Sequence, residues 1–312
     1  MRSGTRAAVL LAVGLAGCGD YSTEDLRFLA ALPRREDLRV EVPAQGSPGA
    51  LVGPCTTRIA ERWLWAKPTS DGLGAGVDFV LGLVDLVRRI PPTWREDEAR
   101  GWGPFDDEQH PGRELRIVIS RSYPPALGGA PAHAYAFEAR VKGTPSFTPV
   151  LGGTFEGASA SGGRGNVVLD FEAMWSVGVA NPDTPHGTLQ IAYDRASEPV
   201  TIELSLAQDG FGIVQFSYGF AGYRDGRGAF DYAFRNAAGD LLTVAASYDA
   251  AGGGRAATGF VLAAGGSGSF RECWDRAACL VYADDPAGYS CGSPPCSFGD
   301  VASCPAVPAP PF

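Results

Sequence analysis

Apolar and polar residues alternate along most of the chain after residue 113. The segment PVTIELSL at 199–206 is the clearest case, with Val200 and Ile202 opposing Thr201 and Glu203. The same alternation recurs at 114–120, 134–141, 166–173, 188–194, 214–220, 230–234, 241–248 and 256–264. A period of two is typical of half-buried β-strands, and Gly-containing turn signals separate the segments. We therefore expect a mainly β fold, an antiparallel up-and-down meander of about ten strands.

Helical periodicity precedes the strand region. Apolar residues recur at helical spacing in three segments, 24–32, 56–67 and 75–90, and a proline follows each of them. The segment at 75–90 is apolar nearly all round, so it must be buried on most sides. A sheet of this length has to curl or close. The pattern thus predicts a closed or half-open barrel with two or three N-terminal helices packed on its apolar face.

The beginning of the chain has the composition of an export signal. Arg2 and Arg6 precede an apolar run at 7–15, and two small residues lead into Cys18. The run is too short for a spanning helix, which needs about 20 residues. LAGC at 15–18 resembles the lipobox of bacterial lipoproteins, and the resemblance implies a diacylated Cys18 that holds the protein to a membrane. Gly19 favours the outer membrane. An ordinary secretory leader with a chance cysteine is the alternative.

These features divide the chain into four parts. Residues 1–17 form the expected signal peptide, and 18–54 a tether or linker with one short helix. Residues 55–272 hold the helices and the barrel or half-barrel. The segment 273–312 is a cysteine-rich C-terminal part that disulfides attach to the body.

Six cysteines other than Cys18 are candidates for disulfides in an exported protein. They are Cys55, Cys273, Cys279, Cys291, Cys296 and Cys304. If all six pair, Cys55 must bond to a cysteine within 273–304. A zinc site on the two local pairs, spaced C-x5-C and C-x4-C, is the alternative. The oxidising compartment favours disulfides.

Charge and motif content argue against several functions. The net charge of −9 repels phosphate backbones, so nucleic acid is not an expected partner. No histidine lies in a metal or catalytic motif, and GASASGG at 157–163 lacks the pattern of a nucleophile elbow. The segment DDEQH at 106–110 predicts an acidic loop with Asp106, Asp107, Glu108 and His110. This loop could hold a divalent ion loosely or simply be solvated. We expect no enzyme activity, no cofactor and no metal.

Aromatic residues concentrate on the apolar faces of the expected strands. Most such residues form core, but together they could line a pocket between sheet and helix for an apolar ligand such as a lipid chain. The candidate pocket residues are Trp63, Phe137, Phe171, Tyr193, Phe216, Tyr218, Phe230 and Tyr232.

An integral outer-membrane barrel would show similar alternation. However, the final VPAPPF cannot form a closing strand, because proline lacks the ladder donor.

The chain resembles a group of uncharacterised bacterial lipoproteins that share a P-P-T-x-R…W-G-P segment. The segments that carry the resemblance are RREDLRVEVP, PPTWREDEARGWGPFDD, GTFEGASASGGRGNVVLDFEA and ECWD with VYADD. The resemblance implies no functional residue. At the level of fold pattern, the chain also looks like the half-barrels of periplasmic lipoprotein carriers.

These observations favour a membrane-tethered exported lipoprotein, a non-catalytic binding or structural protein of the cell envelope. A carrier or sensor of an apolar ligand is the alternative. The expected partners are the membrane, reached through the acyl chains on Cys18, and either another protein or an apolar small molecule.

Overall fold

The computed structural model describes the sheet and the segments packed on it. The residues described are 21–30, 32, 55, 57–61, 87–123, 131–157, 162–182, 184–207, 213–286, 288 and 296–307.

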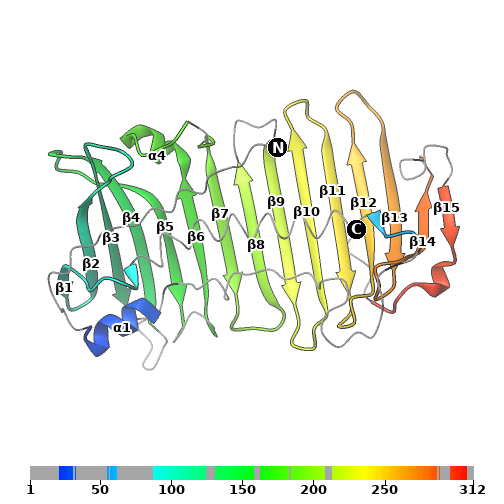
Figure 1. Ribbon diagram of the computed structural model, residues 1–312, viewed down its shortest axis with the longest axis horizontal. Helices are drawn as coiled ribbons and strands as arrows, with labels where there is room; N and C mark the ends of the chain where they lie inside the picture. The colour runs from blue at the N-terminus through cyan, green and yellow to red at the C-terminus, as the bar shows by residue number, and fades with distance from the viewer. Residues whose placement is uncertain are drawn as a thin grey trace, which may run out of the picture.

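Fifteen antiparallel strands form one continuous sheet in which every strand pairs with its neighbours in the chain. Figure 1 shows them side by side in one long row. Their bounds are β1 (Trp94–Glu96), β2 (Ala99–Asp106), β3 (Arg113–Ser122), β4 (Ala132–Val141), β5 (Thr148–Glu156), β6 (Arg164–Asp170), β7 (Thr188–Asp194), β8 (Val200–Ala207), β9 (Ile213–Gly222), β10 (Gly228–Asn236), β11 (Leu241–Tyr248), β12 (Gly254–Val261), β13 (Ser267–Trp274), β14 (Leu280–Asp285) and β15 (Cys296–Gly299).

The predicted antiparallel meander is confirmed, but two of its details are wrong. The sheet has fifteen strands rather than about ten, and it is open. Among the described strands, β1 pairs with β2 alone and β15 with β14 alone, so the two edges do not meet. Both edge strands are short, with three and four residues. Short edges offer little backbone for pairing with another chain, so the sheet does not need to close.

Glycines occur inside several strands, among them β2 and β5, which the pattern missed, and aromatic rings of neighbouring strands pack over these glycines. Tyr135 pairs directly with Gly153, and Tyr193 with Gly165. A Cβ at Gly153 would lie 2.5 Å from the Tyr135 hydroxyl, so the ring occupies the space above the glycine. The same arrangement recurs in the register pairs Trp94–Gly101, Tyr248–Gly228, Trp274–Gly254 and Phe260–Gly268. Each ring supplies the packing surface that the glycine lacks.

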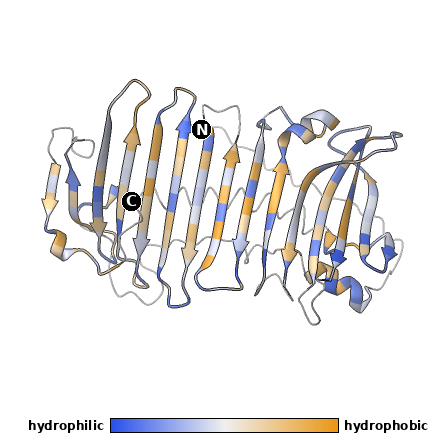
Figure 2. Cartoon of the chain, turned by 180° about the vertical axis from the view of Figure 1, so that it is seen from behind, coloured by the Kyte–Doolittle hydropathy of each residue, from blue (hydrophilic) through white to orange (hydrophobic). Residues whose placement is uncertain are grey.

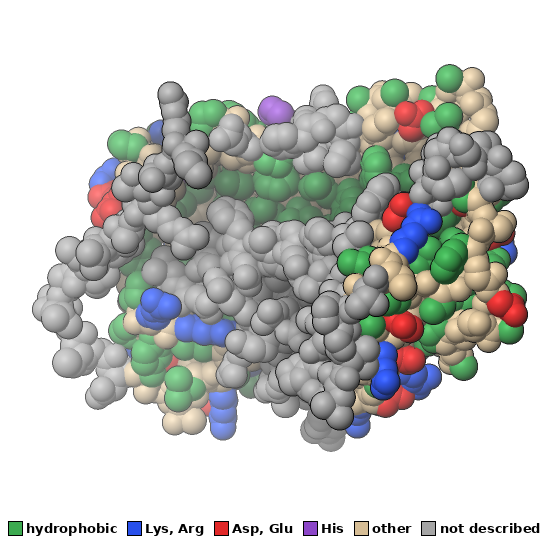
Figure 3. Space-filling model, turned by 45° about the vertical axis from the view of Figure 1, so that its right-hand side comes forward, with side chains coloured by type: hydrophobic (Ala, Val, Ile, Leu, Met, Phe, Trp, Pro, Cys, Tyr) green, Lys and Arg blue, Asp and Glu red, His purple; other side chains and the backbone are tan. Residues whose placement is uncertain are grey.

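One face of the sheet is apolar and buried, and the other is polar. Figure 2 shows hydrophobic and hydrophilic residues alternating along the strands. Figure 3 shows hydrophobic side chains over the central strands, with charged side chains toward the margins. The buried residues form one cluster that extends from Trp102 on β2 through Ile191 on β7 to Phe270 on β13. A single core therefore runs the length of the sheet.

Two short α-helices accompany the described strands. Helix α1 (Thr23–Ala30) lies against the β2–β4 end, and α4 (Phe171–Val177) connects β6 to β7. The Asp170 carboxylate caps α4 by accepting a hydrogen bond from the Ala173 N–H, and Gly178 ends it in the left-handed conformation. Phe171 therefore begins a helix, whereas the alternation had predicted that a strand continues through it.

The predicted set of two or three N-terminal helices is not matched. Of the expected helix at 56–67, the described start is extended, and Ile59 forms a β-bridge with Cys279. Hydrogen bonds from Ala60 N to Ala278 O (3.0 Å) and from Leu280 N to Arg58 O (2.7 Å) hold it there. This tertiary pairing keeps residues 57–60 out of the helix, and Glu61, the last described residue of the segment, is helical. The remainder of that segment and most of 75–90 lie outside the described residues.

Two disulfides attach distant parts of the chain to the C-terminal strands. Cys55 bonds to Cys279 and Cys273 to Cys304. Cys296 is disulfide-bonded as well, whereas Cys291 and Cys18 lie outside the described residues. If all six candidate cysteines pair, Cys55 must bond to a cysteine within 273–304, and the Cys55–Cys279 disulfide is such a bond. None of the helices described here is both long and apolar enough to cross a membrane.

Candidate functional site

The strongest candidate site lies where α1 packs on the ends of β2, β3 and β4. The helix begins with a capping box, in which the Asp25 N–H donates to Ser22 Oγ (3.0 Å) and the Ser22 N–H donates to Asp25 Oδ2 (2.9 Å). Such reciprocal bonds satisfy helix N–H groups that otherwise lack partners. One face of the helix is fully inside the protein, where Phe28 has no exposed surface.

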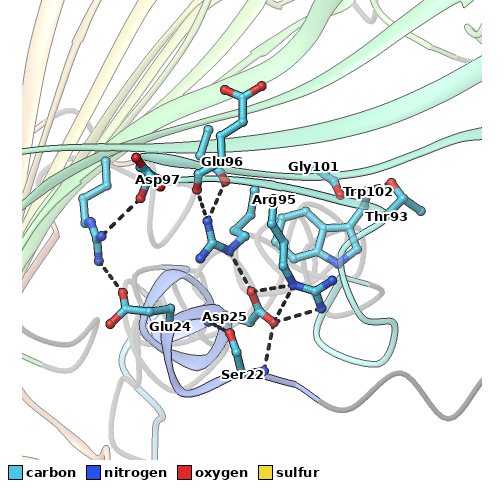
Figure 4. A network of polar contacts seen from close by, with 12 residues as sticks. Ser22, Glu24, Asp25, Thr93, Arg95, Glu96, Asp97, Gly101 and Trp102 are labelled. Carbon is cyan, nitrogen blue, oxygen red and sulfur yellow. Dashed lines mark hydrogen bonds and ion pairs between the residues drawn. The ribbon is translucent and has the colours of Figure 1, made fainter.

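Asp25 anchors α1 to the sheet (Figure 4). Its side chain has no exposed surface, and it accepts hydrogen bonds from Arg100 Nε (2.7 Å) and Arg95 Nε (3.1 Å). Burial by itself raises the pKa of this carboxyl group. The hydrogen bonds from Arg95, Ser22 and Arg100 outweigh burial and hold the pKa of Asp25 well below its usual range. The buried carboxylate is therefore charged and fully paired.

Phe28 contacts two arginines of the sheet. The guanidinium carbons of Arg100 and Arg121 lie 4.7 Å and 4.8 Å from its ring centroid, within cation–π distance. Arg121 also bonds to Glu24 of α1 (3.0 Å) and to Glu98 of the β1–β2 turn (3.2 Å). Each arginine thus has an aromatic contact and an ionic partner. Together these contacts make α1 part of the body.

His133 is the least satisfied polar group of this region. Its ring lies edge-on to Phe28 (5.9 Å between centroids) and beside Phe155 (6.2 Å). Neither ring nitrogen has a hydrogen-bond partner, and the residue is only 5% exposed. Burial, and after it the positive charge of Arg121, lower the pKa of His133 to about 4. The imidazole is therefore neutral at pH 7.

A cavity of about 490 Å³ opens beside this cluster. Its wall includes Thr23, Leu26 and Arg27 of α1, and Arg121, Tyr123 and His133 of the sheet side. Leu26 and Tyr123 are 55% and 57% exposed, which places them among the most exposed large apolar side chains of the described residues. The cavity thus combines an exposed apolar rim with a buried polar base.

The ionisable side chains of this region are paired with one another or packed against aromatic rings. The carboxylates of Glu24 and Asp25 are engaged by arginines, and the neutral imidazole of His133 touches aromatic rings rather than a nucleophile. Within the described residues, no group of three or more metal-ligating side chains comes together.

A second cavity of about 370 Å³ lies over β5–β8. Its lining is largely polar and includes the ion pair of Glu156 with Arg164 (2.8 Å), Asp194 and Glu203. Most of these side chains belong to the polar face of the sheet. The cavity is an open depression on the polar face of the sheet.

Most of the aromatics predicted to line an apolar pocket are buried residues of the core cluster. Phe137, Phe171, Tyr193, Tyr218, Phe230 and Tyr232 are buried in one cluster, and Phe216 packs against it. The rings stack across strands, Tyr218 with Phe230 at 6.4 Å between centroids. Of these residues only Tyr193 lines either of the two cavities described above. Trp63 lies outside the described residues.

The acidic loop between β2 and β3 binds its own backbone. Asp107 accepts hydrogen bonds from the N–H groups of Gln109 and His110, and its other oxygen contacts His110 Nδ1 (2.7 Å). Asp106 points away to Lys142 (2.6 Å). The expected acidic cluster is thus divided between a turn and a surface ion pair.

Sequence reasoning missed the residues that hold α1 in place, although a signal for them exists. Arg100, Arg121 and His133 occupy the alternate positions that place Trp102, Ile119 and Tyr135 on the apolar face. A polar residue at such a position needs a partner, since burying it alone is costly. Register places Arg121 directly opposite His133. Asp25, which pairs with Arg100, and Glu24, which pairs with Arg121, are too far away in the chain to be recognised from spacing.

The chain matches no protein-family model, no curated protein and no solved structure.

Proposed function

We propose that this chain is a lipid-anchored protein of the bacterial cell envelope that acts by non-catalytic binding. Export is supported by the two disulfides, because such bonds persist in oxidising compartments. Lipidation is supported by the charged and apolar leader that ends in LAGC at Cys18. Acyl chains stabilise membrane attachment by about 0.8 kcal/mol per buried methylene, so two or three chains make a durable anchor.

The observation that carries the proposal is how few residues separate Cys18 from the packed part of the chain. The described structure starts at Tyr21, whose hydroxyl donates to the Arg88 carbonyl (3.1 Å). Phe28, Leu29 and Leu32 then join the core of the sheet. An anchor at residue 18 therefore holds a long, disulfide-stapled sheet close to a membrane, which suits a scaffold with a large surface for partners.

Metabolic labelling with an alkyne fatty acid tests the anchor. The wild-type protein should be labelled and should fractionate with the outer membrane. Cys18→Ser should lose both the label and the membrane association, whereas the matched control Cys304→Ser should keep the label. An unlabelled wild-type protein in the soluble periplasmic fraction would contradict the proposal.

A second function, carriage of an apolar ligand, is favoured by the cavity beside α1. Its volume of about 490 Å³ lies within the range of roughly 300–1,000 Å³ that ligand sites occupy. Native mass spectrometry of the Cys18→Ser protein, made in a periplasm without detergent, separates the two functions. A bound lipid mass that disappears on denaturation would favour carriage, and a bare protein mass would favour the scaffold.

A further inference from the structure

The α1 end of the sheet carries exposed apolar groups in one place. Leu26 and Tyr123 come from α1 and from the end of β3, and both line the same cavity. Arg27 lines it too, and its side chain is 65% exposed. Tyrosine is enriched at membrane–water interfaces, and an arginine with its apolar stem can place its charge among head groups. This set is defined here as the α1 surface.

The length of chain available limits how far the α1 surface can lie from the anchor. Only three peptide steps separate Cys18 from Tyr21, and a fully extended chain spans at most about 3.6 Å per residue. The reach is therefore roughly 10 Å. The head-group layer of one leaflet is about 5–8 Å thick. Helix α1, which begins at Thr23, therefore cannot move far from this layer.

Helix α1 cannot swing independently of the sheet while its contacts persist. Asp25 is paired with two arginines of the strands, and Phe28 contacts Arg100 and Arg121. The position of the helix therefore sets the position of the whole β1–β4 end. The opposite edge strand, β15, lies fourteen strand spacings from β1 along the sheet, which corresponds to roughly 65–70 Å.

The charges at this end indicate what kind of surface it meets. Glu24 is compensated by Arg27 and Arg121, but Glu96 and Asp97 of the adjacent β1–β2 hairpin are exposed. These acidic groups would be repelled by a strongly anionic membrane. Apolar insertion into a zwitterionic head-group layer suits the α1 surface better than attraction by a basic patch.

We propose that the α1 surface lies in the head-group layer of the membrane to which Cys18 is anchored, with Leu26 and Tyr123 inserted. This inference rests on the proposed lipidation of Cys18. The β15 end then lies away from the membrane, and the long polar face between the two ends is presented to partners at a set orientation.

The full lipidated chain in phosphatidylcholine vesicles tests this placement. A fluorescent amino acid is introduced at position 123, and in a matched variant at Phe298 of β15, which is 47% exposed. Quenching by head-group spin-labelled lipid should remove most of the emission at 123 and leave that at 298 unchanged. Adding Leu26→Glu to the position-123 variant should restore its emission, whereas adding Val301→Glu should not.

The outcomes separate the two proposals. A purified chain whose intact mass lacks acyl groups overturns both the lipidation and the placement that rests on it. A chain that carries acyl groups but shows equal quenching at positions 123 and 298 overturns the placement alone. Strong quenching at 298 with little at 123 overturns it as well, since the sheet would then approach the membrane by its other end.

Discussion

Replacing His133 with phenylalanine should stabilise the protein, and by much more at pH 4 than at pH 7. Burial, followed by the charge of Arg121, lowers the pKa of His133 from 6.5 to about 4. Between these values the unfolded chain binds a proton that the folded protein excludes. Because the unfolded state binds more protons, the free energy of unfolding decreases as the pH falls through this window. The contribution of the neutral His133 to the free energy of unfolding is fully present above pH 6.5 and is lost as the pH falls toward 4.

The magnitude follows from the two pKa values, 6.5 and about 4. At 1.36 kcal/mol per pH unit, the wild-type protein loses about 3 kcal/mol between pH 7 and pH 4 through this residue. The variant loses none of it. At pH 7 the variant also removes two buried ring nitrogens that lack partners. An unsatisfied buried polar group costs about 1–3 kcal/mol, so a gain of that order is expected there. Phenylalanine keeps the ring contacts with Phe28 and Phe155.

Urea unfolding of both proteins in the Cys18→Ser background, with disulfides intact, measures these differences at pH 7, 5.5 and 4. The gap between the unfolding free energies should widen steadily as the pH falls. The control is His186→Phe, because the His186 side chain is 54% exposed and bonds to an equally accessible Glu172. Parallel pH curves for wild type and His133→Phe would refute the reasoning, as would an NMR titration of His133 near pH 6.5.

Three further predictions concern the fold. Asp25→Ala should cost about 3–5 kcal/mol, because it leaves a buried guanidinium without its carboxylate; hydrogen exchange should show α1 opening first, and unchanged protection would contradict this. Gly153→Ala should cost about 1–3 kcal/mol in thermal unfolding, since a Cβ there meets backbone at 2.1 Å. In the control Gly152→Ala, the new Cβ lies 3.4 Å from its nearest neighbour, the Tyr135 carbonyl oxygen, so the loss of stability should be much smaller. Cys273→Ser with Cys304→Ser opens a loop of 31 residues and should cost about 4 kcal/mol of unfolding free energy; an unchanged urea midpoint would argue against it.

The alternation of residues predicted the central strands well, because it reports directly on a sheet with one buried face. β8 and β11 are examples in which Val200 and Leu241 begin the strands as expected. One strand that the prediction missed is β5, where Pro149 and the Gly152–Gly153 pair interrupt the alternation. The ring of Tyr135 on the neighbouring β4 packs over Gly153, a contribution that a scan along one segment does not detect.

The α1 contacts were unpredictable for a related reason. The capping potential of Ser22 is visible in the sequence, and so is the apolar face of the short helix. Which strands receive that face depends on ion pairs between Asp25 and arginines at residues 95 and 100, seventy and seventy-five positions away. Pairing over such separations is decided by the meander, which returns β2, β3 and β4 to one end of the sheet.

The sequence by itself determined the local features of this protein: an alternating pattern that makes antiparallel strands, six cysteines besides Cys18, and a leader that predicts a lipid anchor. These depend on the intrinsic period of a strand and on the chemistry of single residues. The tertiary structure decided the number of strands, the open edges, the extended start of the expected helix at 56–67, and the buried Asp25–Arg100 pair. Each of these depends on free energies of packing and pairing between segments far apart in the chain, which no local window contains.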